Sequence, residues 1–159
     1  MINRATVKVV YVGLLVFAAS LAIYAQDRPA DSMQIVHEAI RAEKKLLISQ
    51  NMQLTEAEAA AFWPVYERYQ HDLQQLLDRR VKLIKEYAAN YPNLSDAVAQ
   101  KLLDDFMAQE EDRVRLSKSY LPQFRKVLSA TKVARYYQLE NKVRAVMDYE
   151  MAANIPIIQ

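Results

Sequence analysis

The stretch L-T-E-A-E-A-A-A-F-W at residues 54–63 decides the fold of this chain. A Ser or Thr oxygen ahead of a helix accepts hydrogen bonds from the free N–H groups of the first turn, and a leucine before it packs back on that turn. Thr55 and Glu58 have the spacing of a capping box, in which each side chain bonds the backbone N–H of the other residue. The stretch therefore predicts a helix that begins just after Thr55.

Two further stretches repeat this leucine–hydroxyl pair. Leu94-Ser95 precedes D-A-V-A-Q-K-L-L, and Leu128-Ser129 precedes A-T-K-V-A-R-Y-Y. The one glycine of the chain, Gly13, lies outside the long segments that these pairs start. Apolar residues recur in these segments at intervals of three and four, the period of an amphipathic helix. We expect an all-α fold without strands, with four helices over about 33–50, 56–90, 95–127 and 130–152.

The first 25 residues have the composition of a secretory signal peptide. Arg4 and Lys8 give a positive start, an apolar run follows, and small residues come after it. We expect cleavage after Ala25 or Ala22 and a periplasmic mature protein. The alternative is an uncleaved N-terminal anchor. With cleavage after Ala25, we expect residues 26–31 to form a short flexible leader and residues 32–159 to form one helical domain.

Composition excludes several classes of function. Removal of Arg4 and Lys8 with the signal peptide leaves 19 basic residues against 19 acidic ones, so the mature chain lacks the basic footprint of a nucleic-acid-binding protein. The chain has no cysteine, which excludes thiol catalysis and most structural zinc sites. It contains no glycine-rich phosphate loop and no G-x-S-x-G motif. The sequence thus gives the least support to an enzyme or a metal carrier.

The residues that can hold metals or transfer protons are scattered. His37 and His71 fall on different predicted helices, and neither has a second histidine three or four residues later. The acidic runs at residues 104–105 and 110–112 are typical of a solvated helix face. We expect no enzymatic activity, no cofactor and no metal.

The second and third predicted helices are long, and the short turn N-Y-P-N at residues 90–93 joins them. Two such helices pair antiparallel, and residue i then lies level with a residue near 185 − i. This register places Pro64 level with Pro122, and a proline inside a helix bends it. We expect a bent hairpin with an aromatic cluster at the bend. The alternative is two independent local kinks.

The same register predicts two ion pairs across the hairpin. Arg80 falls opposite Asp105, and Asp72 falls opposite Arg113. Arg80 occupies a position in an otherwise apolar stripe, where a charge pair can fix the alignment of two long helices. The alternative is that the side chains of Arg80 and Asp105 extend outward into solvent.

The helix starts resemble the motif of the LTxxQ family of periplasmic proteins, the Spy/CpxP-like group. L-T-E-A-E at 54–58 is the nearest copy, with Glu58 in place of glutamine, and L-S-A-T-K at 128–132 is a looser one. L-S-D-A-V at 94–98 keeps the leucine and the hydroxyl residue. The segments F-W-P-V-Y-E-R-Y at 62–69 and A-A-N-I-P-I-I at 152–158 indicate an uncharacterised branch of this group.

The resemblance implies a bent helical hairpin, an antiparallel homodimer and binding of other proteins without catalysis. It implies an ATP-independent chaperone that holds unfolded clients in the envelope. The alternative is an envelope-stress regulatory module that docks on the periplasmic domain of a membrane sensor. No nucleic acid is expected as a partner, and no membrane after cleavage.

A surface that holds varied clients needs adaptable apolar side chains beside charged ones, and methionine suits this role. The candidate protein-binding residues lie on the first and last predicted helices. They are Met33, Ile40, Leu47, Met147 and Met151. The alternative for each of them is a place in the helical core.

Overall fold

The computed structural model describes residues 42–158, and these residues form helices without any strand. Residues 42–52 are helical, and three long helices follow: α3 (Glu56–Asn90), α4 (Asp96–Val127) and α5 (Ala130–Asn154). The predicted all-α fold is confirmed. The signal peptide, its cleavage sites, the leader and most of the first predicted helix lie outside the described residues.

The three helix starts lie where the leucine–hydroxyl pairs predict them. Thr55 accepts from the backbone N–H of Glu58 at 3.3 Å, and the Glu58 carboxylate accepts from the N–H of Thr55 at 2.8 Å, which completes the capping box. Ser95 caps α4 and Ser129 caps α5, each by accepting from an N–H three residues later at 3.4 Å. The helix bounds therefore follow from local capping chemistry.

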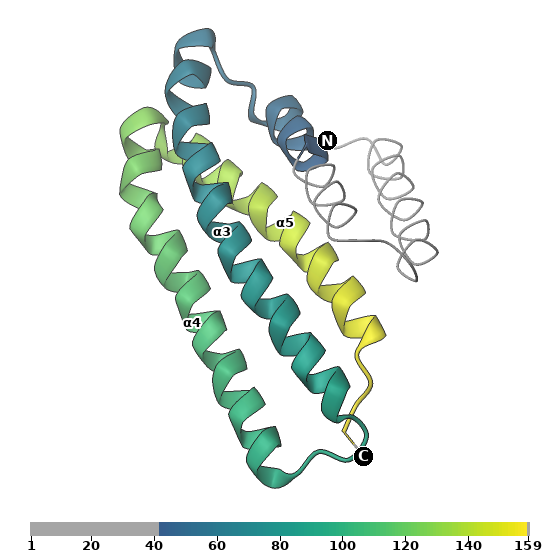
Figure 1. Ribbon diagram of the computed structural model, residues 1–159. Helices are drawn as coiled ribbons and strands as arrows, with labels where there is room; N and C mark the ends of the chain where they lie inside the picture. Colours follow the sequence, from purple (N-terminus) through teal and green to yellow (C-terminus); the bar gives the residue numbers. More distant parts are fainter. Residues whose placement is uncertain (1–41, 159) are drawn as a thin grey trace. The chain divides into compact units, whose positions relative to one another are not determined.

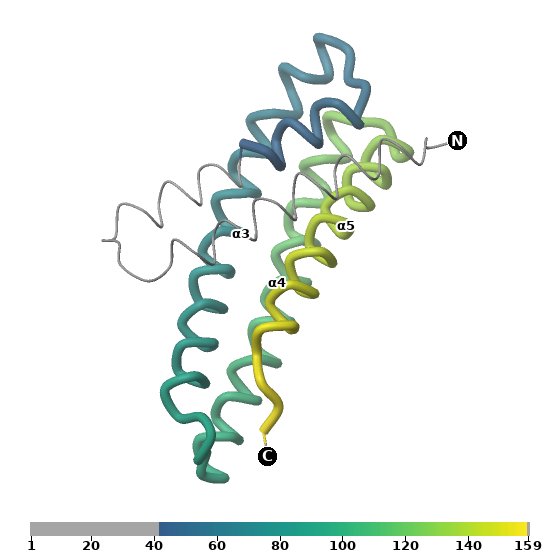
Figure 2. Tube along the Cα trace, turned by 90° about the vertical axis from the view of Figure 1, so that its right-hand side faces the viewer, coloured from purple at the N-terminus to yellow at the C-terminus, as the bar shows by residue number. Residues whose placement is uncertain are grey.

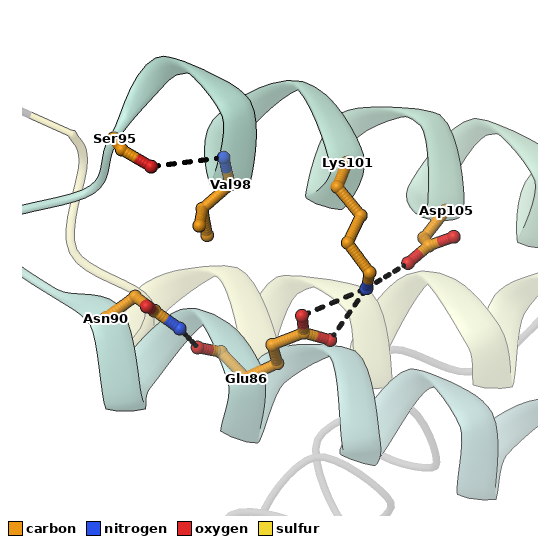
Figure 3. Close-up of polar contacts among 6 residues, drawn as sticks. All are labelled: Glu86, Asn90, Ser95, Val98, Lys101 and Asp105. Carbon is orange, nitrogen blue, oxygen red and sulfur yellow. Dashed lines mark hydrogen bonds and ion pairs between the residues drawn. The ribbon is translucent and has the colours of Figure 1, made fainter.

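The helices α3, α4 and α5 belong to one compact unit, Leu47–Gln159. The helices α3 and α4 run side by side in opposite directions, and α5 runs back along them toward the turn that joins α3 to α4 (Figure 1, Figure 2). The Tyr87 hydroxyl donates to the carbonyl of Pro156 and holds the end of the chain near this turn. At the same end, Lys101 bridges Glu86 and Asp105, at 2.9 Å to each (Figure 3).

The core is aromatic and lies at the opposite end from that turn. Phe62 and Phe124 are fully buried, and Tyr136 of α5 packs against both, with ring centroids at 5.2 and 4.6 Å. The predicted aromatic cluster near the two prolines is therefore confirmed. Pro64 and Pro122 lie inside α3 and α4 without ending either helix. The shared bend stays a prediction.

The tyrosines of this core place their hydroxyls against polar partners. Tyr69 shares a hydrogen bond with the Ser117 hydroxyl at 2.9 Å, and Tyr120 donates to Asp72 at 2.6 Å. Burial, assisted by Asp72, raises the pKa of Tyr120 to about 12. These bonds join α3 to α4, while Gln70 joins α3 to α5 by donating to the Tyr136 hydroxyl at 3.2 Å.

The predicted ion pair between Arg80 and Asp105 is wrong. Arg80 lies over the ring of Phe106, 4.3 Å from its centroid, and reaches Glu110 at 3.7 Å. Asp105 accepts from Lys101 of its own helix. Arg80 thus combines a cation–π contact with a long ion pair.

The second predicted pair, Asp72 with Arg113, is also wrong, since Tyr120 bonds Asp72 and Arg113 contacts Glu110 at 3.5 Å. The physical reason is the direction of helical side chains, which lean toward the N-terminus of their own helix. In an antiparallel hairpin the side chains of α3 therefore lean away from the connecting turn, and those of α4 lean toward it. Each residue of α3 therefore contacts residues of α4 that come later in the sequence than the α4 residue at the same backbone height.

The residues just before α3 and in its first turn bond to the start of α5. Lys132 donates to the carbonyl of Gln53 at 3.1 Å and pairs with the Glu58 carboxylate. Gln53 has a positive φ of 49°, which is uncommon for a residue other than glycine. The hydrogen bond from Lys132, followed by that from the Thr55 N–H, lowers the pKa of Glu58.

We predict that Tyr136→Ala lowers the free energy of unfolding by about 3–5 kcal/mol, because it leaves a cavity where the three helices meet. Tyr136→Phe keeps the ring and removes one hydrogen bond, for a loss of about 1 kcal/mol. Urea denaturation followed by circular dichroism measures both changes. Equal losses for the two variants would contradict the role of the ring.

We predict that Glu58→Gln destabilises the protein at neutral pH and that this difference shrinks in acid. The folded-state pKa of Glu58 lies below its usual value of 4.5. Its contribution is therefore complete above pH 4.5 and is lost as the pH falls through the lowered folded-state pKa. Urea denaturation at a series of pH values measures this, with Glu56→Gln in the same helical turn as the control. A pH-independent difference for Glu58→Gln would contradict the pairing with Lys132.

Candidate protein-binding surfaces

Burial differs sharply between the two ends of the three-helix unit. The core end holds the aromatic cluster, and we call residues 71–119 and 141–158 the turn end. Within the turn end only Leu102 is buried, although α3, α4 and α5 all carry apolar side chains there. Half-buried apolar side chains leave area that another polypeptide can cover.

One face of α5 shows this change along its length. Tyr136 is fully buried and Glu140 is buried, and both contact Gln70 of α3. Val143, Met147 and Met151 continue the same face at helical spacing, yet each is only half-buried. We call these three residues the α5 stripe. It forms an adaptable apolar surface that stays partly open to solvent.

The candidate binding residues predicted from the sequence do not all share one environment. Met147 and Met151 lie together on the α5 stripe. Leu47 is partly buried against the aromatic core, which gives it a packing role. Met33 and Ile40 lie outside the described residues. The structure thus brings two of the five candidates together.

A groove of about 420 Å³ lies between the C-terminal half of α4 and the first turns of α5, and none of its lining residues belongs to the α5 stripe. Its apolar residues come from both helices, and its charged residues are all basic. The apolar lining is Val114, Leu121, Ala130, Val133, Ala134 and Tyr137, and the basic lining is Arg113, Lys118 and Arg125. Burial, with a smaller effect of nearby Tyr69, raises the pKa of Tyr137 above its ordinary value. This hydroxyl stays neutral and donates to the Ser117 carbonyl at 2.8 Å.

The outer face of α4 also exposes apolar side chains. Leu103, Met107 and Val114 are 60%, 54% and 43% exposed, and their spacing places them on one face of the helix. Sequence reasoning missed both this face and the groove. A second apolar row on α4, beside the row that contains Leu102 and Phe106, is the signal that could have revealed the face.

No group of three or more His, Asp or Glu side chains within residues 42–158 lies close enough to hold a metal ion. None of the helices in this range is long and apolar enough to cross a membrane.

Comparison with known proteins adds no family. No protein-family model matches the chain, and searches of curated proteins and of solved structures give no match. The resemblance to the LTxxQ group stays an interpretation of the helix-start residues.

Proposed function

We propose that this protein binds segments of other polypeptides and holds them without nucleotide, as an ATP-independent chaperone-like protein of the periplasm. The observation that carries the proposal is the change along one face of α5, which is buried at Tyr136 and only half-buried at Met147 and Met151 of the α5 stripe. The signal-peptide composition of residues 1–25 supports the location.

The chemistry of the stripe suits clients of varied sequence. Methionine side chains are flexible and polarisable, so they adapt to differently shaped apolar partners. Charged residues flank the stripe, since Arg144 pairs with Asp148 at 3.0 Å on the same helix. A partner thus meets apolar contacts bordered by both signs of charge.

The packing of α5 allows the α5 stripe to change position when a partner binds. The backbones of α3 and α4 approach closely, whereas α5 reaches α3 through long side chains at the core end. Few buried contacts hold the second half of α5, and segments of this kind open at low free-energy cost. Binding can therefore reposition this half of α5 without disrupting the aromatic core.

We predict that the purified exported protein, without nucleotide, suppresses aggregation of an unrelated unfolding protein near equal stoichiometry. Met147→Gln/Met151→Gln should weaken suppression several-fold, because it removes apolar contacts from a stripe that is already half-exposed. Light scattering during thermal aggregation of the client measures the effect.

The matched control is Ala145→Gln/Ala152→Gln, which adds the same side chains at exposed positions of α5. Circular dichroism shows whether each variant keeps its helices. Absence of suppression at several-fold excess of the wild-type protein would contradict the proposed function. Equal activity of the two double variants would remove the α5 stripe from it.

A further inference from the structure

The apolar floor of the groove between α4 and α5 is built on the aromatic core. Val133 is buried in that core, and the half-buried Leu121 and Tyr137 pack against it while they line the groove. The core thus holds the floor in place before any ligand binds. A volume of about 420 Å³ lies within the range of about 300–1,000 Å³ that is typical of small-molecule sites. The groove therefore has the size and the support of a preformed site for a small ligand.

The hydroxyl groups that line the groove already have partners. The Tyr137 hydroxyl donates to the Ser117 carbonyl at 2.8 Å, and the Ser117 hydroxyl shares a hydrogen bond with Tyr69 at 2.9 Å. An extended peptide in the groove would therefore bury backbone N–H and C=O groups without finding partners among these hydroxyls, which costs free energy. An alkyl chain carries no such groups, so the floor of the groove favours an alkyl chain.

The charged residues of the groove are all basic, and their pairing is incomplete. Lys118 and Arg125 are exposed and make no ion pair or hydrogen bond with the part of the chain that the structure describes. They are seven residues apart and so lie along one side of α4. Arg113 reaches Glu110 only at 3.5 Å, and its buried Nε has no hydrogen-bond partner within residues 42–158. The groove therefore offers cations to an anionic ligand.

We propose that this groove binds the anion of a single-chain fatty acid, with the carboxylate against Lys118 and Arg125. The alkyl chain lies over Leu121, Val133 and Tyr137, where it is removed from water. The carboxylate accepts charge-assisted hydrogen bonds, which are roughly twice as strong as bonds between neutral groups. One ligand thus satisfies both the apolar floor and the basic rim.

The dimensions and the charges favour this ligand over other occupants. The lining residues of α4 extend from Arg113 to Arg125, roughly 18 Å along the helix, which suits one extended chain of the length of dodecanoate. A membrane phospholipid brings two longer chains and would leave much of its apolar area in water. A neutral amphiphile would leave the basic rim unpaired, and a cationic one would be repelled by it.

This site is separate from the proposed client binding, because no residue of the α5 stripe lines the groove. Fatty-acid binding is measured without a client, and suppression of aggregation is measured without a fatty acid. The failure of either activity is therefore observed independently of the other.

Isothermal titration calorimetry of the complete exported protein tests the proposal, with sodium dodecanoate kept below the concentration at which it forms micelles. We expect saturable binding of one dodecanoate per chain. Dodecyltrimethylammonium has the same alkyl chain and the opposite charge, so it should bind at least about tenfold more weakly. Acetate, which has the carboxylate and no long chain, should give no measurable heat of binding.

Absence of saturable dodecanoate binding, or equal affinity for the two amphiphiles, would overturn the proposal. Sedimentation with vesicles of phosphatidylglycerol tests a membrane surface as the alternative occupant. Binding to these vesicles without binding to monomeric dodecanoate would overturn the choice of ligand.

The variant Lys118→Gln/Arg125→Gln should weaken dodecanoate binding about tenfold or more, because it removes both cations that face the carboxylate. The matched control is Lys126→Gln/Lys142→Gln, which removes two positive charges at exposed positions outside the groove and should leave the affinity unchanged. Circular dichroism shows whether each variant keeps its helices. Equal weakening by the two double variants would reduce the effect to net charge and overturn the assignment of the rim.

Added bulk in the groove tests the position of the alkyl chain. Ala134 is an exposed member of the lining, so Ala134→Leu occupies ligand space without removing a core contact and should weaken binding several-fold. Ala145→Leu, at an exposed position of α5 outside the groove, is the control. In two-dimensional NMR spectra, dodecanoate should shift the backbone amide signals of residues 113–137. Shifts confined to residues 143–151 would place the ligand on the α5 stripe and overturn the assignment.

Discussion

The contact of Tyr136 with Phe62 and Phe124 is the interaction on which the rest of the structure depends. These three rings come from three different helices and are fully buried together. The ring of Tyr136 lies between α5 and the hairpin, and hydrogen bonds from Gln70 extend this junction to Glu140. Beyond this point the second half of α5 loses its buried partners, which leaves the α5 stripe half-exposed.

The sequence predicts the fold where the physics is local. Thr55, Ser95 and Ser129 cap the helices in the predicted way because an N-cap needs only its own first turn. The aromatic cluster was predictable because helical spacing and a short turn bring Tyr66 and Phe124 to similar heights. The contacts of Arg80 were not predictable, because they depend on the direction in which long side chains lean in two antiparallel helices.

The binding surfaces were predictable only in part. Met147 and Met151 were identified from helical spacing and residue type, and the structure places them on one half-buried stripe. The groove beside Leu121 was not identified, because its existence depends on how α5 packs on α4. The exposure of Val114 is likewise a property of packing. Residue types alone therefore predicted an apolar binding surface, whereas the location of such a surface depends on how α5 packs.

The central claim is that α5 is held firmly at Tyr136 and only loosely at its methionines, where it meets clients. Hydrogen–deuterium exchange of backbone amides, with and without an unfolded client, tests this most directly. The account predicts slow exchange around Tyr136, faster exchange from Val143 to Met151, and slowing of the faster segment when client is added. Uniform protection along α5, with no response to client, would contradict it.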